Sequence, residues 1–182
     1  MRKKTANLTA ASIIAHRLTY NSNHIERSRL TKEQTRYIFE TNTLGITTEN
    51  TRIDDIMETV NHFRCIDYII DHATDKITEA HIKHLHLILK TNTSDSQKSW
   101  FAVGDYKKLA NEVGGEATVQ SHEVSKRMSH LLAEYNSLQK VELDHILNFH
   151  VLFERTNVYL RDICVTAQDN YKALLNYFNI KY

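Results

Sequence analysis

The chain has 182 residues, of which 41% are hydrophobic and 25% are charged, the composition of one ordinary globular domain. Lys and Arg number 23 against 22 for Asp and Glu, so the formal net charge is only +1. This balance gives no support for nucleic acid or a membrane surface as a partner. No stretch approaches the roughly 18 apolar residues of a membrane span.

The sequence also lacks the marks of an exported or disulfide-rich protein. Residues 1–4 are basic but are not followed by the hydrophobic core of a signal peptide. The only cysteines, Cys65 and Cys164, form neither a disulfide framework nor a metal-ligand set. We therefore expect a cytoplasmic protein that contacts neither nucleic acid nor membrane.

Turn-forming residues are scarce. The chain contains no proline and four glycines, at positions 45, 104, 114 and 115. Sheet-rich folds use both residue types in their turns, so this scarcity favours long helices. Three of the four glycines fall between about 91 and 118, which we predict to be the one irregular region. Without repeats or a linker, residues 1–182 are expected to form a single domain.

Apolar residues recur at helical spacing in seven segments. Thr31-Lys32-Glu33-Gln34 has the form of a capping box, and Thr78 is a second candidate cap. The predicted helices run from about 8 to 26, 31 to 40, 52 to 72, 78 to 89, 118 or 121 to 135, 141 to 155, and 165 to 179. Residues 99–118 are predicted to form a hairpin. The predicted fold class is all-α with one short β-hairpin flap.

Histidine is the first candidate for chemistry, because the chain contains eleven. His81, His84 and His86 fall on one predicted helix, and His145 and His150 on another. Zinc needs three or four ligands that converge. His81 and His84 share a face but His86 points elsewhere, and neither H-E-x-x-H nor a cysteine pair completes a set. We therefore predict no metal site.

Phosphate-binding and nucleophile motifs are also absent from the sequence. Neither G-x-G-x-x-G nor G-x-x-x-x-G-K can be built from these four glycines, and a serine nucleophile elbow is missing. The pair Gly114-Gly115 fits a hairpin turn better than a phosphate loop. The residues alone therefore predict no catalytic constellation.

Four segments, in order along the chain, together point to a resemblance. They are residues 18–26, Leu-Thr-Tyr-Asn-Ser22-Asn-His-Ile-Glu26, residues 100–115, residues 149–155, Phe-His-Val-Leu-Phe-Glu-Arg, and residues 160–171. They resemble four motifs of the Fic (filamentation induced by cAMP) family. In the same order, these motifs are its N-terminal inhibitory motif, its target-positioning hairpin, the end of the helix that leads into its catalytic loop, and its closing helix.

This resemblance implies a Fic-like helical bundle with an inhibitory region at 8–40, a core at 51–155 carrying a flap at 99–118, and a closing helix at 163–180. It implies a protein adenylyltransferase, which moves AMP from ATP to a hydroxyl of a target protein with Mg²⁺. The inhibitory residues would be Ser22 and Glu26. The flap residues that dock the target would be Phe101, Gly104, Tyr106, Gly114 and Gly115.

The sequence departs from the family where the catalytic loop should stand. That loop reads His-Pro-Phe, two residues, then Gly-Asn-Gly-Arg, whereas residues 156–161 here are Thr-Asn-Val-Tyr-Leu-Arg. If His150 were the base, Asn157 and Arg161 would follow it by seven and eleven residues instead of six and eight. The sequence therefore resembles a member with an internal deletion after Arg155. We predict no catalytic residue and no bound ATP or Mg²⁺.

Three interpretations remain open. The chain can be a degenerate, catalytically impaired adenylyltransferase, or a binding module that docks a partner segment on the flap. It can also retain activity if a second chain or a longer form of the protein supplies the missing parts. Loss of the helix that follows the catalytic loop should expose apolar surface, so we expect a homo-oligomer.

A second departure lies at Arg27, where the inhibitory motif has Gly or Asn. A small residue there suits the end of a helix. Arginine is bulky and charged, and it can pair with Glu26 or project into the pocket. Alternatively, Glu26 and Arg27 are simply solvated charges at a helix end.

Overall fold

The computed structural model describes residues 10–45, 50–110, 112–113 and 116–156. Within these residues the regular secondary structure is helical apart from one short hairpin, which confirms the predicted all-α class. The helices are α1 (Ala10–Ile25), α2 (Lys32–Thr41), α3 (Ile53–Asp71), α4 (Glu79–Lys90), α5 (Val124–Ser137) and α6 (Leu143–Thr156). Single 3₁₀ turns occur at Asp95–Gln97 and Ser121–Glu123. The predicted closing helix at 163–180 lies outside the described residues.

The hairpin is much shorter than the predicted flap. Strand β1 (Glu112–Val113) pairs antiparallel with β2 (Glu116–Ala117), so that residue 112 lies opposite 117 and residue 113 opposite 116. The residues before β1, from about 98 to 110, form turns and bends instead of a strand. The reason is that this segment is held against α4, as described below.

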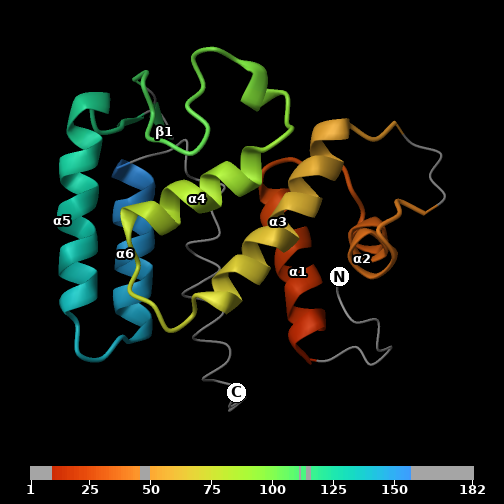
Figure 1. Cartoon of the computed structure of the whole chain (residues 1–182), viewed down its shortest axis with the longest axis horizontal. Helices are drawn as coiled ribbons and strands as arrows, with labels where there is room; N and C mark the ends of the chain where they lie inside the picture. The colour runs from red at the N-terminus through yellow and green to blue at the C-terminus, as the bar shows by residue number, and fades with distance from the viewer. Residues whose placement is uncertain (1–9, 46–49, 111, 114–115, 157–182) are drawn as a thin grey trace.

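Helix α3 lies in the middle of the molecule (Figure 1). It packs against α1 and α2 on one side and against α4 on the other, and α4 in turn contacts α5. Helices α5 and α6 run antiparallel as a pair at the edge opposite α2 (Figure 1). None of the described helices combines the length and the apolar character that a bilayer span would need.

Two predicted caps are confirmed by their hydrogen bonds. The Thr31 hydroxyl accepts from the Gln34 backbone N–H at 3.1 Å, and the Gln34 side-chain oxygen accepts from the Thr31 N–H at 2.8 Å. This reciprocal pair starts α2. The Thr78 hydroxyl accepts from the His81 N–H at 3.2 Å and starts α4.

The buried apolar residues form two clusters that meet at α3. Phe63 and Ile66 of α3 belong to the smaller cluster, with Ala15, Leu30 and Ile38. The larger cluster joins α3 to α4, α5 and α6, and it contains Cys65, Ile69, Ile77, Ile82, Leu85, Leu89, Tyr106, Val124, Met128, Leu131, Leu132, Phe149 and Phe153. Helix α3 is therefore buried on two faces.

Because α3 has so little free surface, its buried polar side chains must find partners inside the protein. Asn61 is completely buried, and its side-chain N–H₂ donates to the carbonyls of Leu89 and Thr91 at 2.9 and 2.8 Å. These are carbonyls at the end of α4, which have no partner within their own helix. Asn61 thus fixes the end of α4 against the middle of α3.

Candidate functional site

The segment Ser22–Glu26, which resembles the inhibitory motif, forms the last turn of α1 and its cap. The Ser28 N–H donates to the Asn23 carbonyl at 2.9 Å, and the Arg27 N–H donates to the His24 carbonyl at 3.0 Å. These are the two hydrogen bonds of a Schellman motif, which places Arg27 at the left-handed position. Its φ is +68°. The side chains of Glu26 and Arg27 are both exposed.

This geometry explains why Gly or Asn suits the residue after the glutamate. A left-handed backbone costs a residue with a Cβ roughly 1–2 kcal/mol, and Gly avoids that cost. At Arg27 the constraint therefore acts on the backbone conformation and not on the side chain. Of the alternatives left open by the sequence, the exposure of Arg27 favours a solvated side chain at the helix end.

A row of hydrogen bonds joins α3 to α1 and to the segment that follows it, and holds this end in place. Each involves a buried polar group of α3, and they join Thr19 to His62 (3.0 Å), Asn23 to Thr59 (2.8 Å) and the Arg29 N–H to Asp55 (3.1 Å). Asn23 lies inside the inhibitory-type motif itself. The position of Glu26 is therefore set by α3 and not by α1 alone.

The loop that leads into β1 is anchored to α4 through Gly104. The Gly104 N–H donates to Nδ1 of His86 at 3.1 Å, and Gly104 has a φ of +72°. A Cβ at this position would lie 3.2 Å from the Cβ of Leu87. Both the backbone conformation and the close approach to α4 therefore require glycine.

Tyr106 is the second anchor of the loop. Its ring is buried beneath the Lys83 ammonium, 4.5 Å from the ring centre, and its hydroxyl donates to Glu79 at 2.8 Å. Burial, together with this glutamate, raises the pKa of Tyr106 well above its usual range. Lys83 also pairs with Asp105 at 2.9 Å. Tyr106 is thus fixed on the inner side of the loop.

The same loop exposes two large apolar side chains. Trp100 is 45% exposed, and Leu109 is exposed to a similar degree. Phe101 is half-buried, with its ring 5.5 Å from that of His86. Gly114 and Gly115, the other predicted flap residues, lie outside the described residues.

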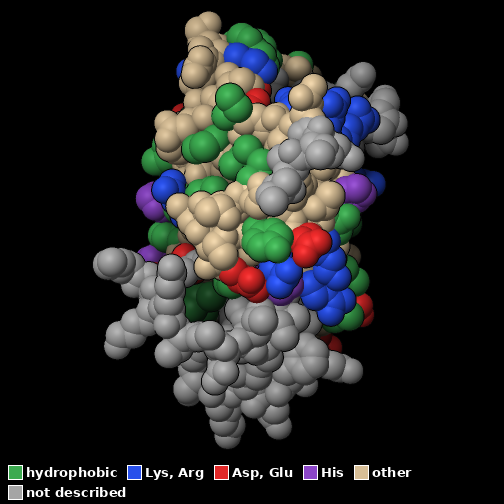
Figure 2. Space-filling model, turned by 90° about the vertical axis from the view of Figure 1, so that its right-hand side faces the viewer, with side chains coloured by type: hydrophobic (Ala, Val, Ile, Leu, Met, Phe, Trp, Pro, Cys, Tyr) green, Lys and Arg blue, Asp and Glu red, His purple; other side chains and the backbone are tan. Residues whose placement is uncertain are grey.

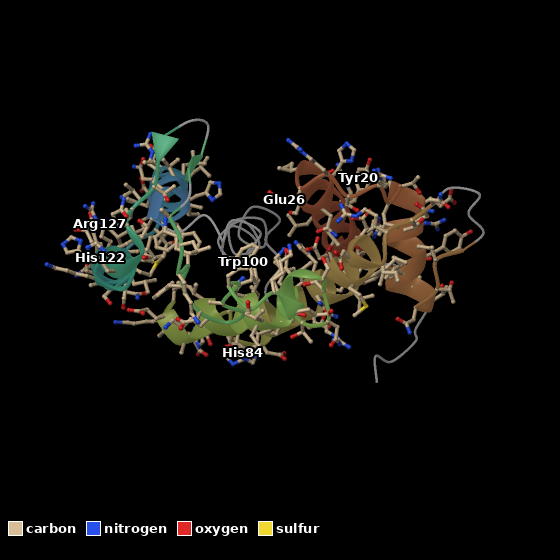
Figure 3. All side chains as sticks on the ribbon, turned by 90° about the horizontal axis from the view of Figure 1, so that it is seen from above. Tyr20, Glu26, His84, Trp100, His122 and Arg127 are labelled. Carbon is tan, nitrogen blue, oxygen red and sulfur yellow. The ribbon has the colours of Figure 1, made fainter. Side chains whose placement is uncertain are left out.

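The two parts of the candidate site face the same region of the molecule. Seen from above, Glu26 and Trp100 both lie toward the middle, between α1–α3 on one side and α5–α6 on the other (Figure 3). The segment after β2 is joined to the end of α6, because the Val119 N–H donates to the Arg155 carbonyl at 3.4 Å. The end of α6 is where the family's catalytic loop would begin. Residues 157–182 lie outside the described part.

A pocket of about 420 Å³ lies elsewhere, between α5 and α6. Lys126, Arg127 and His130 line it, but Glu123 and Glu134 line it as well. In Figure 3, Arg127 and His122 mark this side of the molecule, well away from Glu26. The mixed charge gives the pocket no preference for an anion such as a nucleotide phosphate.

Arg36 on α2 likewise has acidic neighbours and does not belong to a patch of one sign. Arg36 lies 3.2 Å from Glu33 and 3.7 Å from Glu40. On the face that Figure 2 shows, acidic side chains (red) lie next to basic ones (blue) in the lower part of the described surface. This surface therefore adds no electrostatic argument for binding nucleic acid.

Comparison with solved structures identifies the fold. A Fic domain containing signaling protein from Bacteroides thetaiotaomicron aligns with 91% of this chain and 72% of its own, at a TM-score of 0.63 and 20% identity. A Fic family protein from Desulfovibrio desulfuricans aligns with 94% of this chain at a TM-score of 0.67 and 22% identity. The chain has the fold of Fic domain proteins.

Other comparisons limit what can be concluded from this likeness. The chain spans 53% of the length of the Desulfovibrio protein. No family model matches the sequence, and no curated protein matches it either. The likeness thus confirms the Fic-like fold. The roles of Ser22, Glu26 and the flap residues stay predictions.

The sequence did not reveal which residues hold the loop in place. Glu79, Lys83 and His86 lie on α4, four and three residues apart, on the side that meets the loop. This spacing is a detectable signal, but a polar set on one helix face is more often solvated. Only the structure shows that the chain turns back after α4 and that the loop before β1 covers this face of the helix.

We expect the substitution Arg27→Gly to stabilise the protein, because it relieves a left-handed backbone at a residue with a Cβ. The gain should be about 1 kcal/mol after the greater flexibility of glycine in the unfolded chain is subtracted. In a domain of this size, that raises the melting temperature by roughly 2–4 °C. Thermal unfolding followed by circular dichroism measures it.

The matched control is Arg27→Ala, which removes the charge but keeps the Cβ. It should give no comparable gain. An equal rise in both variants would show that charge at the end of α1, and not backbone conformation, limits stability there.

Proposed function

We propose that this chain is a Fic-family protein of the adenylyltransferase type that has lost its catalytic loop and does not itself transfer AMP. The observation that carries this proposal is the sequence after α6. A His-Pro-Phe motif needs proline, and Gly-Asn-Gly-Arg needs glycine, but the chain has no proline and no glycine beyond Gly115. The Fic-like fold and the capped end of α1 at Glu26 support the family assignment.

The missing residues are the ones that the chemistry requires. A general base must lie within hydrogen-bond reach of the target hydroxyl, and phosphates need close approach to backbone N–H groups. His150 is the nearest histidine before the end of α6, but it lies within that helix and is half-buried. The chain therefore offers no residue of its own to take the proton at the expected place, and ATP and Mg²⁺ are not expected to bind.

A second function is favoured by the loop before β1. Gly104 and Tyr106 fix this loop to α4, while Trp100 and Leu109 remain exposed. Exposed aromatic side chains on a rigid support are typical of the anchors that dominate protein–protein binding. We propose that this surface docks an extended segment of a partner protein, and that the fold serves as a binding module.

Self-association is a third proposal, and it rests on α6. Leu143, Leu147 and Val151 follow each other at one-turn spacing, and all three are exposed, Leu147 by 51%. Such a stripe is self-complementary: an antiparallel pairing centred on Leu147 sets residue 143 of one copy against residue 151 of the other. We propose that a second copy of this chain covers it.

Thermal unfolding with and without Mg²⁺ and ATP tests the loss of the nucleotide site. We expect no change in melting temperature. A ligand at about 100 times its dissociation constant would add about 2.7 kcal/mol, or roughly 5–10 °C for a domain of this size. A shift of that order would contradict the proposal.

The variant Glu26→Gly completes this test. In a family member with an intact site, removing the inhibitory glutamate should release activity, whereas here we expect no transfer of labelled AMP. Glu26→Gln is the conservative control. Labelling that appears in the glycine variant would show that Glu26 still inhibits a working site.

Docking on the loop is tested with the substitution Trp100→Ala and a displayed library of random peptides. Peptides selected on the full chain should bind the variant roughly 30-fold more weakly, because a buried aromatic anchor is worth about 2 kcal/mol or more. Tyr37→Ala, which removes an exposed aromatic ring on α2, should leave binding unchanged. Equal binding by all three proteins would place the docking surface elsewhere.

Sedimentation velocity tests the α6 surface. The full chain should sediment as a dimer, and Leu147→Lys should convert it to a monomer because it buries an unpaired charge at the centre of the interface. Asn148→Lys adds the same charge one residue away and should leave the dimer in place. A monomeric parent protein would overturn this proposal.

A further inference from the structure

The turn between α3 and α4 brings together three potential metal ligands that are separated in the sequence. His72 caps the end of α3, Asp75 lies in the turn, and His81 lies in the first turn of α4. One ligand atom from each lies within 4.8 Å of the other two. Figure 1 shows this turn, in yellow, at the side of the molecule away from β1.

The hydrogen bond of His72 prepares its ring to bind a cation. Its Nδ1 lies 2.8 Å from the backbone carbonyl of Tyr68, and because a carbonyl only accepts, Nδ1 must carry the proton. The lone pair is then on Nε2. Metal-bound histidines generally have this arrangement, in which the second nitrogen donates to a carbonyl or carboxylate.

His81 presents an unusual feature in the same cluster. Its Nδ1 is shielded from solvent and has no hydrogen-bond partner among the described residues. Leaving a buried polar atom unsatisfied costs about 1–3 kcal/mol, so such an atom calls for an explanation. A cation held by His72, Asp75 and His81 supplies one, because the imidazole of His81 can then coordinate it.

Tyr68 covers the cluster and limits the motion of both rings. Its ring centre lies 4.1 Å from that of His72 and 6.0 Å from that of His81. His84, one turn further along α4, is exposed, and its ring centre lies 4.7 Å from that of Tyr68 in a tilted arrangement.

We propose that His72, Asp75 and His81 form a binding site for a divalent transition-metal ion of the zinc type. Two imidazoles and one carboxylate are a ligand set that suits Zn²⁺, and three protein ligands leave the fourth tetrahedral position for water. In such a site the ligand atoms lie roughly 3.3 Å apart. Asp75 is exposed in the turn, so rotation of its side chain can close the remaining distance.

This proposal departs from the sequence-based prediction of no metal site. It does not depend on the proposed function: the site lies on the α3–α4 turn, whereas Glu26 and Trp100 face the middle of the molecule. In Figure 3, His84, which lies beside Tyr68, points away from both.

The test uses the full chain, stripped of metal with a chelator and dialysed. Titration calorimetry with Zn²⁺ alone should show one ion bound per chain, and Co²⁺ should give the visible absorption of tetrahedral coordination. Saturating Zn²⁺, at about 100 times its dissociation constant, should raise the melting temperature by roughly 5–10 °C.

Single substitutions decide which residues bind. His72→Ala and His81→Ala should each weaken Zn²⁺ binding by at least about 100-fold, and Asp75→Asn, which keeps its shape, by about 10–100-fold. His122→Ala removes an exposed histidine elsewhere and should change binding by less than about twofold.

Asp75→Asn keeps the result interpretable if an alanine variant fails to fold, because Asp75 is exposed and the substitution is isosteric. Its melting temperature without metal should match that of the parent chain. The proposal is overturned if the parent shows no one-to-one component, or if that component persists unchanged in Asp75→Asn and His81→Ala.

Discussion

The burial of α3 on two faces is the constraint on which the rest of the structure depends. The polar side chains on the buried faces of α3 have no access to water, so each of them must bond to a partner inside the protein. Asn61 donates hydrogen bonds to carbonyls at the end of α4, while Thr59 and His62 form hydrogen bonds with α1. Both parts of the candidate site, the end of α1 at Glu26 and the loop carried by α4, are therefore placed by one helix. Substitutions on α3 should act on a site that they do not touch.

The loop before β1 shows how an apolar side chain stays exposed on a well-packed protein. A flexible loop would turn Trp100 inward, because burying its ring is favourable. Here Gly104 bonds to His86, and Tyr106 is held by Glu79 and Lys83, so the backbone that follows Trp100 is fixed to α4. The exposure of Trp100 thus results from the contacts of its neighbours. Such a preorganised surface loses little conformational entropy on binding, which favours docking over a purely structural role.

Local patterns were enough to predict the described helices and the start of α2, since hydrophobic spacing and the Thr31 capping box act within a few residues. The hairpin was predicted from 99 to 118 because its glycines and aromatic residues suggested strands, but tertiary contacts with α4 limit pairing to β1 and β2. The anchoring role of Tyr106 could not be read from spacing, since it depends on Glu79, 27 residues earlier. His72 and Asp75 were missed for a related reason. The search for ligands followed single helices, whereas these residues meet His81 only through the turn between α3 and α4.

That turn also determines how α3 and α4 cross. Asn61 fixes their other contact, at the end of α4, so the turn and Asn61 together hold the pair at two separated points. A cation bound by His72, Asp75 and His81 would make the turn the stiffer of these two contacts between α3 and α4. Because α3 positions Glu26 and α4 positions Trp100, such stiffening would act on the relative placement of both residues without contact with either. If the chain serves as the binding module proposed above, the rigidity of this scaffold is the property that matters for affinity.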